Sequence, residues 1–227
     1  MIESGITPPA DVIDDGEIHR FSTNERTENR DGWYVLHGDG IPAGGYGCWR
    51  TLIQSKWKAD LGRPYSPDEL QALKERTELI TKQREAEFAD QAIAAANNAN
   101  RIWSEATLAS HHPYLNKKGI QPYIARESDG DLVIPLLREG KITSLQFINE
   151  DGKKRFLKGG KVSGSYCTIG EITNTASICI CEGYATGASI HEATGNVVVI
   201  AFNAGNLIKV AQSIRNQYPN HEITIAG

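Results

Sequence analysis

The chain has 227 residues, of which 40% are hydrophobic and 23% are charged, and its formal net charge is -4 at pH 7. The length allows one large domain or two small ones with a hydrophobic core, and the composition is close to ordinary globular usage. The acidic balance excludes a general attraction to polyanions, so binding to nucleic acid would require a local basic patch.

The cysteines and the hydrophobic runs exclude several kinds of site and location. No two cysteines have the C-x-x-C spacing of a zinc site, and Cys179 and Cys181 alternate in an apolar run, as buried thiols on one face of a strand would. No run approaches the roughly 20 apolar residues of a membrane span, and the acidic N-terminus does not resemble a signal peptide. We therefore expect a reduced, cytoplasmic protein with no membrane partner and no zinc.

Residues 1–65 predict a small β-rich N-terminal module. The stretch 37–50 contains five glycines among other turn-forming residues. It matches neither the G-x-x-x-x-G-K-[ST] pattern nor a strand-loop-helix context, so tight hairpins are favoured over a phosphate-binding loop.

Residues 66–110 predict a long helical connector. Ser66 can cap the helix, Pro67 suits its first turn and Glu69 completes a capping box. A continuous helix here would be ~60 Å long. We therefore expect a spacer or a pair of helices that is broken near residues 97–100.

Residues 111–176 predict an antiparallel β segment. Strand patterns occur at 132–137, 141–148 and 154–157, and polar turns that contain glycine separate them.

Residues 177–227 alternate between strand and helix patterns. Apolar runs occupy 177–181, 197–201 and 222–226, and helices are expected at 184–193 and 207–218. This order predicts a parallel βαβαβ sheet, which gives the chain a mixed α+β and α/β fold class. Ligands of such sheets bind beyond the carboxyl ends of the strands. Glu182 therefore lies at a candidate site, although it could instead complement a helix dipole, worth ~0.3–1 kcal/mol.

The stretch 179–187 contains Glu182-Gly183-Tyr184-Ala185-Thr186-Gly187 and resembles the first motif of the TOPRIM fold. Primases, type IA and II topoisomerases and some nucleases share this fold. With residues 198–207, the motif is similar to the branch found in phage and plasmid DNA primases. Residues 112–120, 132–137 and 144–160 are also similar to these primases, whereas the N-terminal third resembles their leading module only loosely.

The resemblance implies a partial TOPRIM domain over 177–227 and assigns roles to several residues. Glu182 would be the acid/base group of phosphoryl transfer and a partial ligand of Mg²⁺ or Mn²⁺. The active-site loops would contain Gly183, Asn203, Gly205 and Asn206. In the family a D-x-D pair at the end of the third strand holds the metals, and the chain ends at Gly227, where that pair would begin. Because Glu182 alone is a poor magnesium site, we expect the N-terminal portion of a longer primase, inactive or weak by itself.

A basic stretch supplies candidates for binding template phosphates or an incoming NTP. Residues 138–161 carry seven basic side chains against three acidic ones, in a chain that is acidic as a whole. The candidates in and near this stretch are Lys117, Lys118, Lys153, Lys154, Arg155 and Lys158. A solvated hairpin surface is the alternative. Arg155 and Lys158 would point to opposite faces of a regular strand unless a turn at Gly159-Gly160 intervenes.

The resemblance predicts a nucleotidyltransferase that synthesises RNA primers from NTPs on single-stranded DNA in phage or plasmid replication. A helicase domain or protein would be a further partner. Two alternatives stay open, a TOPRIM nuclease with the same glutamate and metals, and a non-catalytic module that binds single-stranded DNA or a replication partner.

Overall fold

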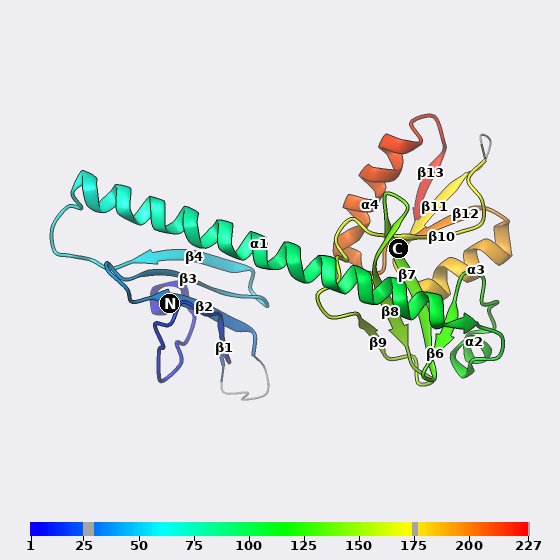
Figure 1. Ribbon diagram of the computed structural model, residues 1–227, viewed down its shortest axis with the longest axis horizontal. Coiled ribbons are helices and arrows are strands. Elements are labelled where there is room, and N and C mark those ends of the chain that lie inside the picture. The colour runs from blue at the N-terminus through cyan, green and yellow to red at the C-terminus, as the bar shows by residue number, and fades with distance from the viewer. Residues whose placement is uncertain (25–29, 174–176, 227) are drawn as a thin grey trace. The chain divides into compact units, whose positions relative to one another are not determined.

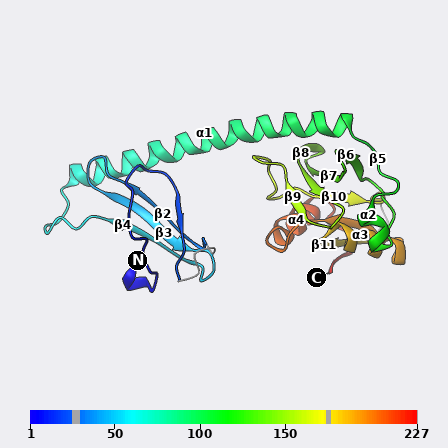
Figure 2. The ribbon, with the colours of Figure 1, turned by 90° about the horizontal axis from the view of Figure 1, so that it is seen from below.

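The computed structural model describes residues 1–24, 30–173 and 177–226 (Figures 1 and 2). The chain divides into two compact units, Met1–Thr81 and Lys82–Gly227. Gly227, at the end of the predicted TOPRIM segment, lies outside the described residues. None of the helices in the described ranges is long and apolar enough to cross a membrane.

The first unit contains a short 3-10 helix, η1 (Ile2–Ser4), and an antiparallel sheet in the order β1-β2-β3-β4. Its strands are β1 (His19–Phe21), β2 (Gly32–His37), β3 (Ala43–Cys48) and β4 (Ile53–Lys58). The hairpins expected from the glycine-rich stretch are present. A Cβ atom at Gly44 would lie 2.0 Å from the Val35 carbonyl oxygen, and one at Gly47 would lie 2.8 Å from Trp33 Nε1. Close packing therefore accounts for these glycines.

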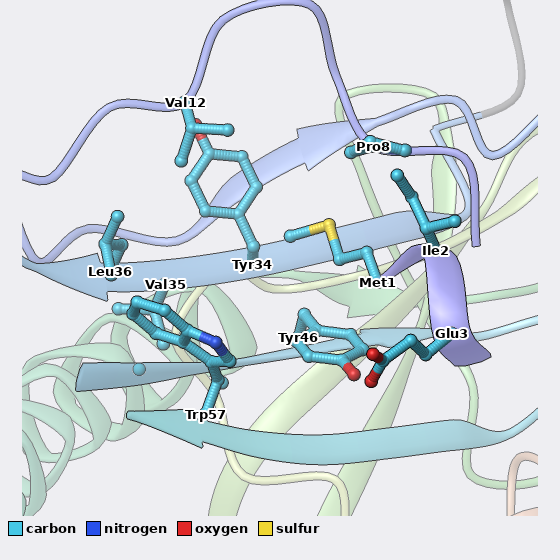
Figure 3. Close-up of a pocket in the computed structure, with 12 residues that line it drawn as sticks. Met1, Ile2, Glu3, Pro8, Val12, Tyr34, Val35, Leu36, Tyr46 and Trp57 are labelled. Atoms are coloured by element: carbon cyan, nitrogen blue, oxygen red, sulfur yellow. The ribbon is translucent and has the colours of Figure 1, made fainter. Parts of the chain in front are cut away.

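A pocket of about 460 Å³ lies between the N-terminal segment and this sheet (Figure 3). Three aromatic side chains, Tyr34, Tyr46 and Trp57, line it together with aliphatic residues from both sides. The Tyr46 hydroxyl lies 2.9 Å from Ser4 Oγ, which links the N-terminal segment to β3.

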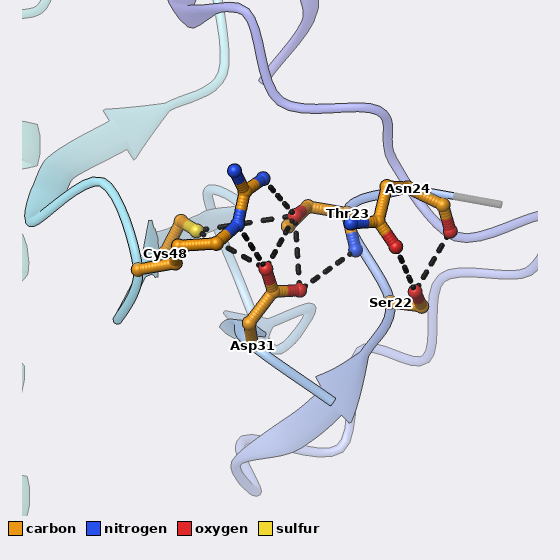
Figure 4. A network of polar contacts seen from close by, with 6 residues as sticks. Ser22, Thr23, Asn24, Asp31 and Cys48 are labelled. Atoms are coloured by element: carbon orange, nitrogen blue, oxygen red, sulfur yellow. Dashed lines mark hydrogen bonds and ion pairs between the residues drawn. The ribbon is translucent and has the colours of Figure 1, made fainter. Parts of the chain in front are cut away.

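A buried carboxylate joins three strand ends of the same unit (Figure 4). Asp31 is 8% exposed. It accepts hydrogen bonds from the Thr23 backbone N–H at 3.0 Å and from Arg50 Nε at 2.9 Å. The Arg50 guanidinium, and then the Thr23 amide, hold the pKa of Asp31 well below its usual range.

Helix α1 (Pro67–Glu105) is continuous over 39 residues, so of the two alternatives the helical pair broken near residues 97–100 is wrong and a single long helix is present. The predicted capping box is confirmed, because Glu69 N donates to Ser66 Oγ at 3.2 Å and Ser66 N donates to Glu69 Oε2 at 2.8 Å. Ala99 is fully buried against a sheet of the second unit. Asn100 donates to the Ala96 carbonyl at 2.8 Å, within the helix. Burial of small side chains thus outweighs the low helix propensity of the asparagines.

The second unit contains an antiparallel sheet in the order β5-β6-β7-β8-β9. Its elements are β5 (Thr107–Leu108), helix α2 (Pro113–Lys118), β6 (Arg126–Ser128), β7 (Asp131–Arg138), β8 (Lys141–Ile148) and β9 (Lys154–Phe156). Strands β7, β8 and β9 lie where the sequence predicts the antiparallel segment.

The other sheet of this unit has the order β10-β12-β11-β13. Its elements are β10 (Cys167–Ile169), β11 (Ile178–Cys181), α3 (Tyr184–Thr194), β12 (Val197–Ile200), α4 (Ala204–Gln217) and β13 (Ile223–Ala226). Strand β11 is parallel to both β12 and β13, as the alternating pattern predicts, and the short antiparallel strand β10 was not predicted. The assignment of this sheet to the TOPRIM fold stays a prediction.

The layers of the second unit follow from the two faces of its antiparallel sheet (Figure 2). Val133, Leu145 and Phe147 pack with α1 residues on one face. Leu132, Ile134 and their neighbours pack on the other face against the parallel sheet, with Cys179 and Cys181 in the shared core. Burial raises the pKa of both thiols, as expected for buried, unreactive cysteines.

The Asp31 carboxylate makes the stability of the first unit sensitive to acid. Because its pKa is lower in the folded protein, it stabilises the fold above its ordinary pKa of 3.8 and loses this effect as the pH falls below that value. We expect Asp31→Asn to lower the free energy of unfolding at pH 7, and we expect the difference from the wild-type chain to shrink towards pH 3. Urea unfolding followed by tryptophan fluorescence measures this, because Trp33, Trp49 and Trp57 lie in the first unit.

The exposed Asp11 gives the control variant Asp11→Asn, which should change stability little at either pH. A difference between Asp31→Asn and the wild type that stays constant from pH 7 to pH 3 would contradict the role of Asp31.

Candidate functional site

Glu182 lies at the carboxyl end of three parallel strands, where the sequence predicts it. It follows Cys181, which is paired with Ile200 of β12 on one side and with Ala226 of β13 on the other. Gly183 has an extended backbone and forms the N-cap of α3. The Glu182 side chain is exposed at this edge.

The other residues of the motif have packing roles. A Cβ atom at Gly187 would lie 2.8 Å from Ile200 Cγ1 and 3.2 Å from Cys181 Sγ, so glycine lets α3 pack closely against the sheet. Tyr184 is fully buried, and its hydroxyl donates to the Pro122 carbonyl. Glu182 has no comparable packing role, which leaves its carboxylate available for chemistry.

A lysine from the antiparallel sheet lies beside this carboxylate. A Cβ atom at Gly183 would be 3.6 Å from Lys154 Nζ and 3.8 Å from Thr186 Oγ1, so the ammonium group lies at the start of α3. Desolvation lowers the pKa of Lys154, the charge of Glu182 opposes this shift, and the charge of Lys118 adds to it. The structure thus gathers two lysines and one carboxylate at the carboxyl end of β11.

Strand alternation separates Lys154 from its neighbour Arg155. Arg155 pairs with Phe147 on the face that α1 covers. Its guanidinium lies 4.0 Å from the Phe147 ring centre and donates to Asp131 at 2.8 Å. Phe156, like Lys154, points to the other face and packs against the core shared with the parallel sheet. Arg155 is therefore not brought to Glu182.

The remaining basic candidates differ in their surroundings. Lys117 and Lys118 are exposed in the last turn of α2, and Lys118 also lines a depression of about 480 Å³ along α3 that includes Thr186. The exposed Lys153 donates its backbone N–H to Asn149 Oδ1 at 2.7 Å within a turn. Lys158 lies in the turn that reaches Gly160, as the glycine pair suggested, and this turn packs against α1.

The side chain of Asn206, which was predicted to lie in an active-site loop, is buried and hydrogen-bonded within the protein. It is 3% exposed. Its Oδ1 accepts from the Gly164 N–H at 2.6 Å. Its Nδ2 lies within 3.1 Å of the Val162, Ser165 and Ala201 carbonyl oxygens. We therefore interpret Asn206 as a positioning residue that joins the 162–165 turn to the end of β12.

The other residues of this loop are more accessible. Asn203 precedes α4 with an extended backbone, is half-buried and makes no side-chain cap hydrogen bond, and Gly205 is exposed. Phe202 has φ +70°, which is an uncommon conformation for a bulky residue, and its ring meets Phe156 edge-on at 6.2 Å. Sequence reasoning missed this aromatic pair, because a positive φ at phenylalanine has no sequence signal.

The described side chains do not form a site for Mg²⁺ or Mn²⁺ by themselves. Across residues 1–24, 30–173 and 177–226, no group of three or more His, Cys, Asp or Glu side chains could hold a metal ion. At the predicted position, Glu182 offers one carboxylate, and the neighbouring charged group is the Lys154 ammonium. Magnesium requires several oxygen ligands.

The pocket of the first unit is a weaker candidate. Its lining is mostly aromatic and aliphatic, and Glu3 is its charged residue. Such a pocket can hold an apolar group, but its lining offers no acid-base pair.

Comparison with known proteins gives the site a context. The chain is similar to DNA primase TraC of Escherichia coli. One such protein is 34% identical over 98% of this chain and 22% of its own length, and a second is 33% identical over 95% of this chain and 15% of its own length. The chain therefore spans about a fifth or less of the relatives it matches, and the likeness supports a relationship with these primases. No family model and no solved structure matches.

The buried hydrogen bonds of Asn206 predict that its substitution strongly lowers the stability of the fold. Asn206→Ala would leave several buried backbone groups unpaired, so we expect the free energy of unfolding to fall by about 2–4 kcal/mol. Chemical denaturation followed by circular dichroism measures the change.

Asn216, an exposed asparagine of the same helix, provides the matched control variant Asn216→Ala, for which we expect a change within about 0.5 kcal/mol. Equal effects of the two substitutions would contradict the positioning role of Asn206.

Proposed function

We propose that the chain forms part of the catalytic core of a DNA primase that synthesises RNA primers on single-stranded DNA during phage or plasmid replication. The observation that carries this proposal is the position of Glu182. It is an exposed carboxylate at the carboxyl end of parallel strands, with Lys154 beside it. Almost the whole length of this chain is similar to part of DNA primase TraC.

In this proposal Glu182 acts as the general base. It accepts the proton of the primer 3′-hydroxyl while that oxygen forms a bond to the α-phosphorus of the incoming NTP and pyrophosphate leaves with the electrons of the broken P–O bond. The Glu182 carboxylate suits this role because it is exposed. A bound substrate can therefore bring its 3′-hydroxyl within hydrogen-bond distance of it. The same residues at a strand edge also suit strand cleavage, which is the reaction of the nuclease alternative.

The two lysines would bind the phosphates of the substrate. The start of a helix carries a partial positive charge and attracts anions, and Lys154 and Lys118 add two positive charges near the start of α3. A bound phosphate would offset the repulsion between these positive charges and would raise the lowered pKa of Lys154. Substrate binding should therefore favour the charged form of Lys154.

The metal ions of the proposed reaction would require further oxygen ligands. The register places Ala226, the last residue of β13, beside Cys181, which precedes Glu182. The resemblance expects the D-x-D carboxylates at the end of this strand.

Glu182→Gln tests the catalytic role. We expect primer synthesis to fall by about 10²–10⁴-fold, since the amide cannot accept the proton. Affinity for single-stranded DNA should stay within about twofold of the wild type. The assay follows NTP incorporation on single-stranded DNA with magnesium, in the longest polypeptide encoded by the reading frame that contains this chain.

Glu171→Gln changes an exposed glutamate in the same unit and is the control. Full activity of Glu182→Gln would contradict the role of the glutamate. Cleavage of supercoiled DNA without primer synthesis would identify a nuclease, and DNA binding without either reaction would identify the binding module.

Lys154→Gln tests phosphate binding at the same edge. We expect weaker binding to single-stranded DNA and a salt dependence, plotted as log K against log salt concentration, that is shallower by about 0.7 because one phosphate contact is lost. Fluorescence anisotropy with a labelled oligothymidylate measures both. Lys82→Gln, at an exposed position of α1, is the control. An unchanged slope for Lys154→Gln would argue against the contact.

A further inference from the structure

A polar cleft lies in the second unit, and its lining residues are different from those beside Glu182. It has a volume of about 400 Å³, and its lining includes Arg138 at the end of β7, Ser163 and Tyr166 in and after the 162–165 turn, and Lys209, Gln212 and Ser213 of α4. Arg138 is the first basic residue of the stretch 138–161, and it lies here with residues from the 162–165 turn and α4.

The charge of this cleft is positive. Lys209 Nζ donates to Ser163 Oγ at 2.7 Å, which holds the ammonium group over the turn. The Arg138 guanidinium lies 4.0 Å from the position of a Cβ atom at Gly164, above the same turn. Glu139 also lines the cleft, but its side chain is 85% exposed and lies 3.9 Å from Arg138 Nε, so their pairing is weak.

Several hydrogen bonds hold the turn that lines the cleft. Asn206 Oδ1 accepts from the Gly164 N–H, and Ser165 Oγ lies 2.9 Å from Thr143 Oγ1. Ser165 Oγ also donates to the Lys161 carbonyl at 3.0 Å. These bonds hold a surface turn in one conformation, so ligand binding would cost less conformational entropy. The cleft is thus organised before any ligand arrives.

The chemistry of the lining selects an anion with several oxygens. Two cations, the Gln212 amide and the Ser163 and Ser213 hydroxyl groups offer donors, which suit phosphate oxygens, and the Tyr166 hydroxyl already donates to Gln217. The two cations and one carboxylate leave one net positive charge. This matches a phosphodiester, with about one negative charge per nucleotide, better than the multiply charged triphosphate of an NTP.

We propose that this cleft binds the phosphodiester backbone of single-stranded nucleic acid, in addition to the phosphate contact proposed at Lys154. The proposal rests on the proposed function for the identity of the strand, which is the template or the growing primer. The cleft and the Glu182 edge belong to one sheet system, because Asn206 Nδ2 lies 2.9 Å from the Ala201 carbonyl oxygen and the Ala201 N–H donates to the Cys181 carbonyl at 2.8 Å.

The experiment compares Lys209→Gln and Arg138→Gln with Lys82→Gln in the 227-residue chain. Binding of a labelled oligothymidylate is measured by anisotropy over a series of salt concentrations. For each cleft variant we expect affinity at low salt to fall by about threefold to tenfold and the salt slope to decrease by about 0.7. Lys209→Arg keeps the charge and should retain the wild-type slope.

Thermal unfolding of every variant shows whether it is folded, and Arg138→Gln keeps the test decisive if Lys209→Gln is unstable. A slope for Lys209→Gln equal to that of the wild type would overturn the cleft proposal. If Lys154→Gln still lowers the slope in that case, the proposed function stands, whereas absence of DNA binding by the wild-type chain would overturn both.

Binding of ATP, measured in parallel by calorimetry, distinguishes the source of the phosphate. Weaker ATP binding by Lys209→Gln with unchanged oligonucleotide binding would replace the phosphodiester with a free nucleotide and overturn the proposal. Unchanged ATP binding with weaker oligonucleotide binding supports it.

Discussion

The organisation of the second unit depends on an antiparallel sheet that is covered on both faces. Val133, Leu145 and Phe147 meet α1, while the alternate residues of β7 and β8 meet the parallel sheet. Because side chains alternate along a strand, this double burial fixes the register of β7, β8 and β9. A slip by one residue would exchange the two faces and would move Lys154 from the Glu182 edge to the side of α1.

The same constraint gives neighbouring basic residues different electrostatic surroundings. Arg155 has a carboxylate and an aromatic ring as partners, which satisfy its charge within the fold. Desolvation and the charge of Lys118 lower the pKa of Lys154, and the charge of Glu182 opposes this shift. A folded protein gains nothing in stability from such a group, and perturbed lysines of this kind are often found at functional sites. This contrast, more than the number of basic residues, distinguishes the candidate site from a solvated surface.

Local patterns in the sequence were sufficient to place β7, β8 and β9, the alternation of strands and helices after residue 177, and Glu182 at a strand end. Features that depend on contacts between distant segments were not predictable. The short strand β10 is defined by its pairing with β12, and the continuity of α1 depends on the burial of Ala99. The cleft brings Ser163 to Lys209, 46 residues further along the chain. The assignment to the TOPRIM fold rests on the resemblance of sequence motifs, because hydrophobic patterns alone do not specify that fold.

The continuity of α1 has a practical consequence for dissecting the protein. The boundary between the compact units, after Thr81, falls inside this helix and not in a flexible linker. A polypeptide that started at Lys82 would begin with several unpaired backbone N–H groups and without the Ser66 cap. The buried alanines of α1, Ala92, Ala95 and Ala99, begin about three turns further on. An isolated second unit should therefore be given a new capping residue at its start, so that fraying stops before those alanines.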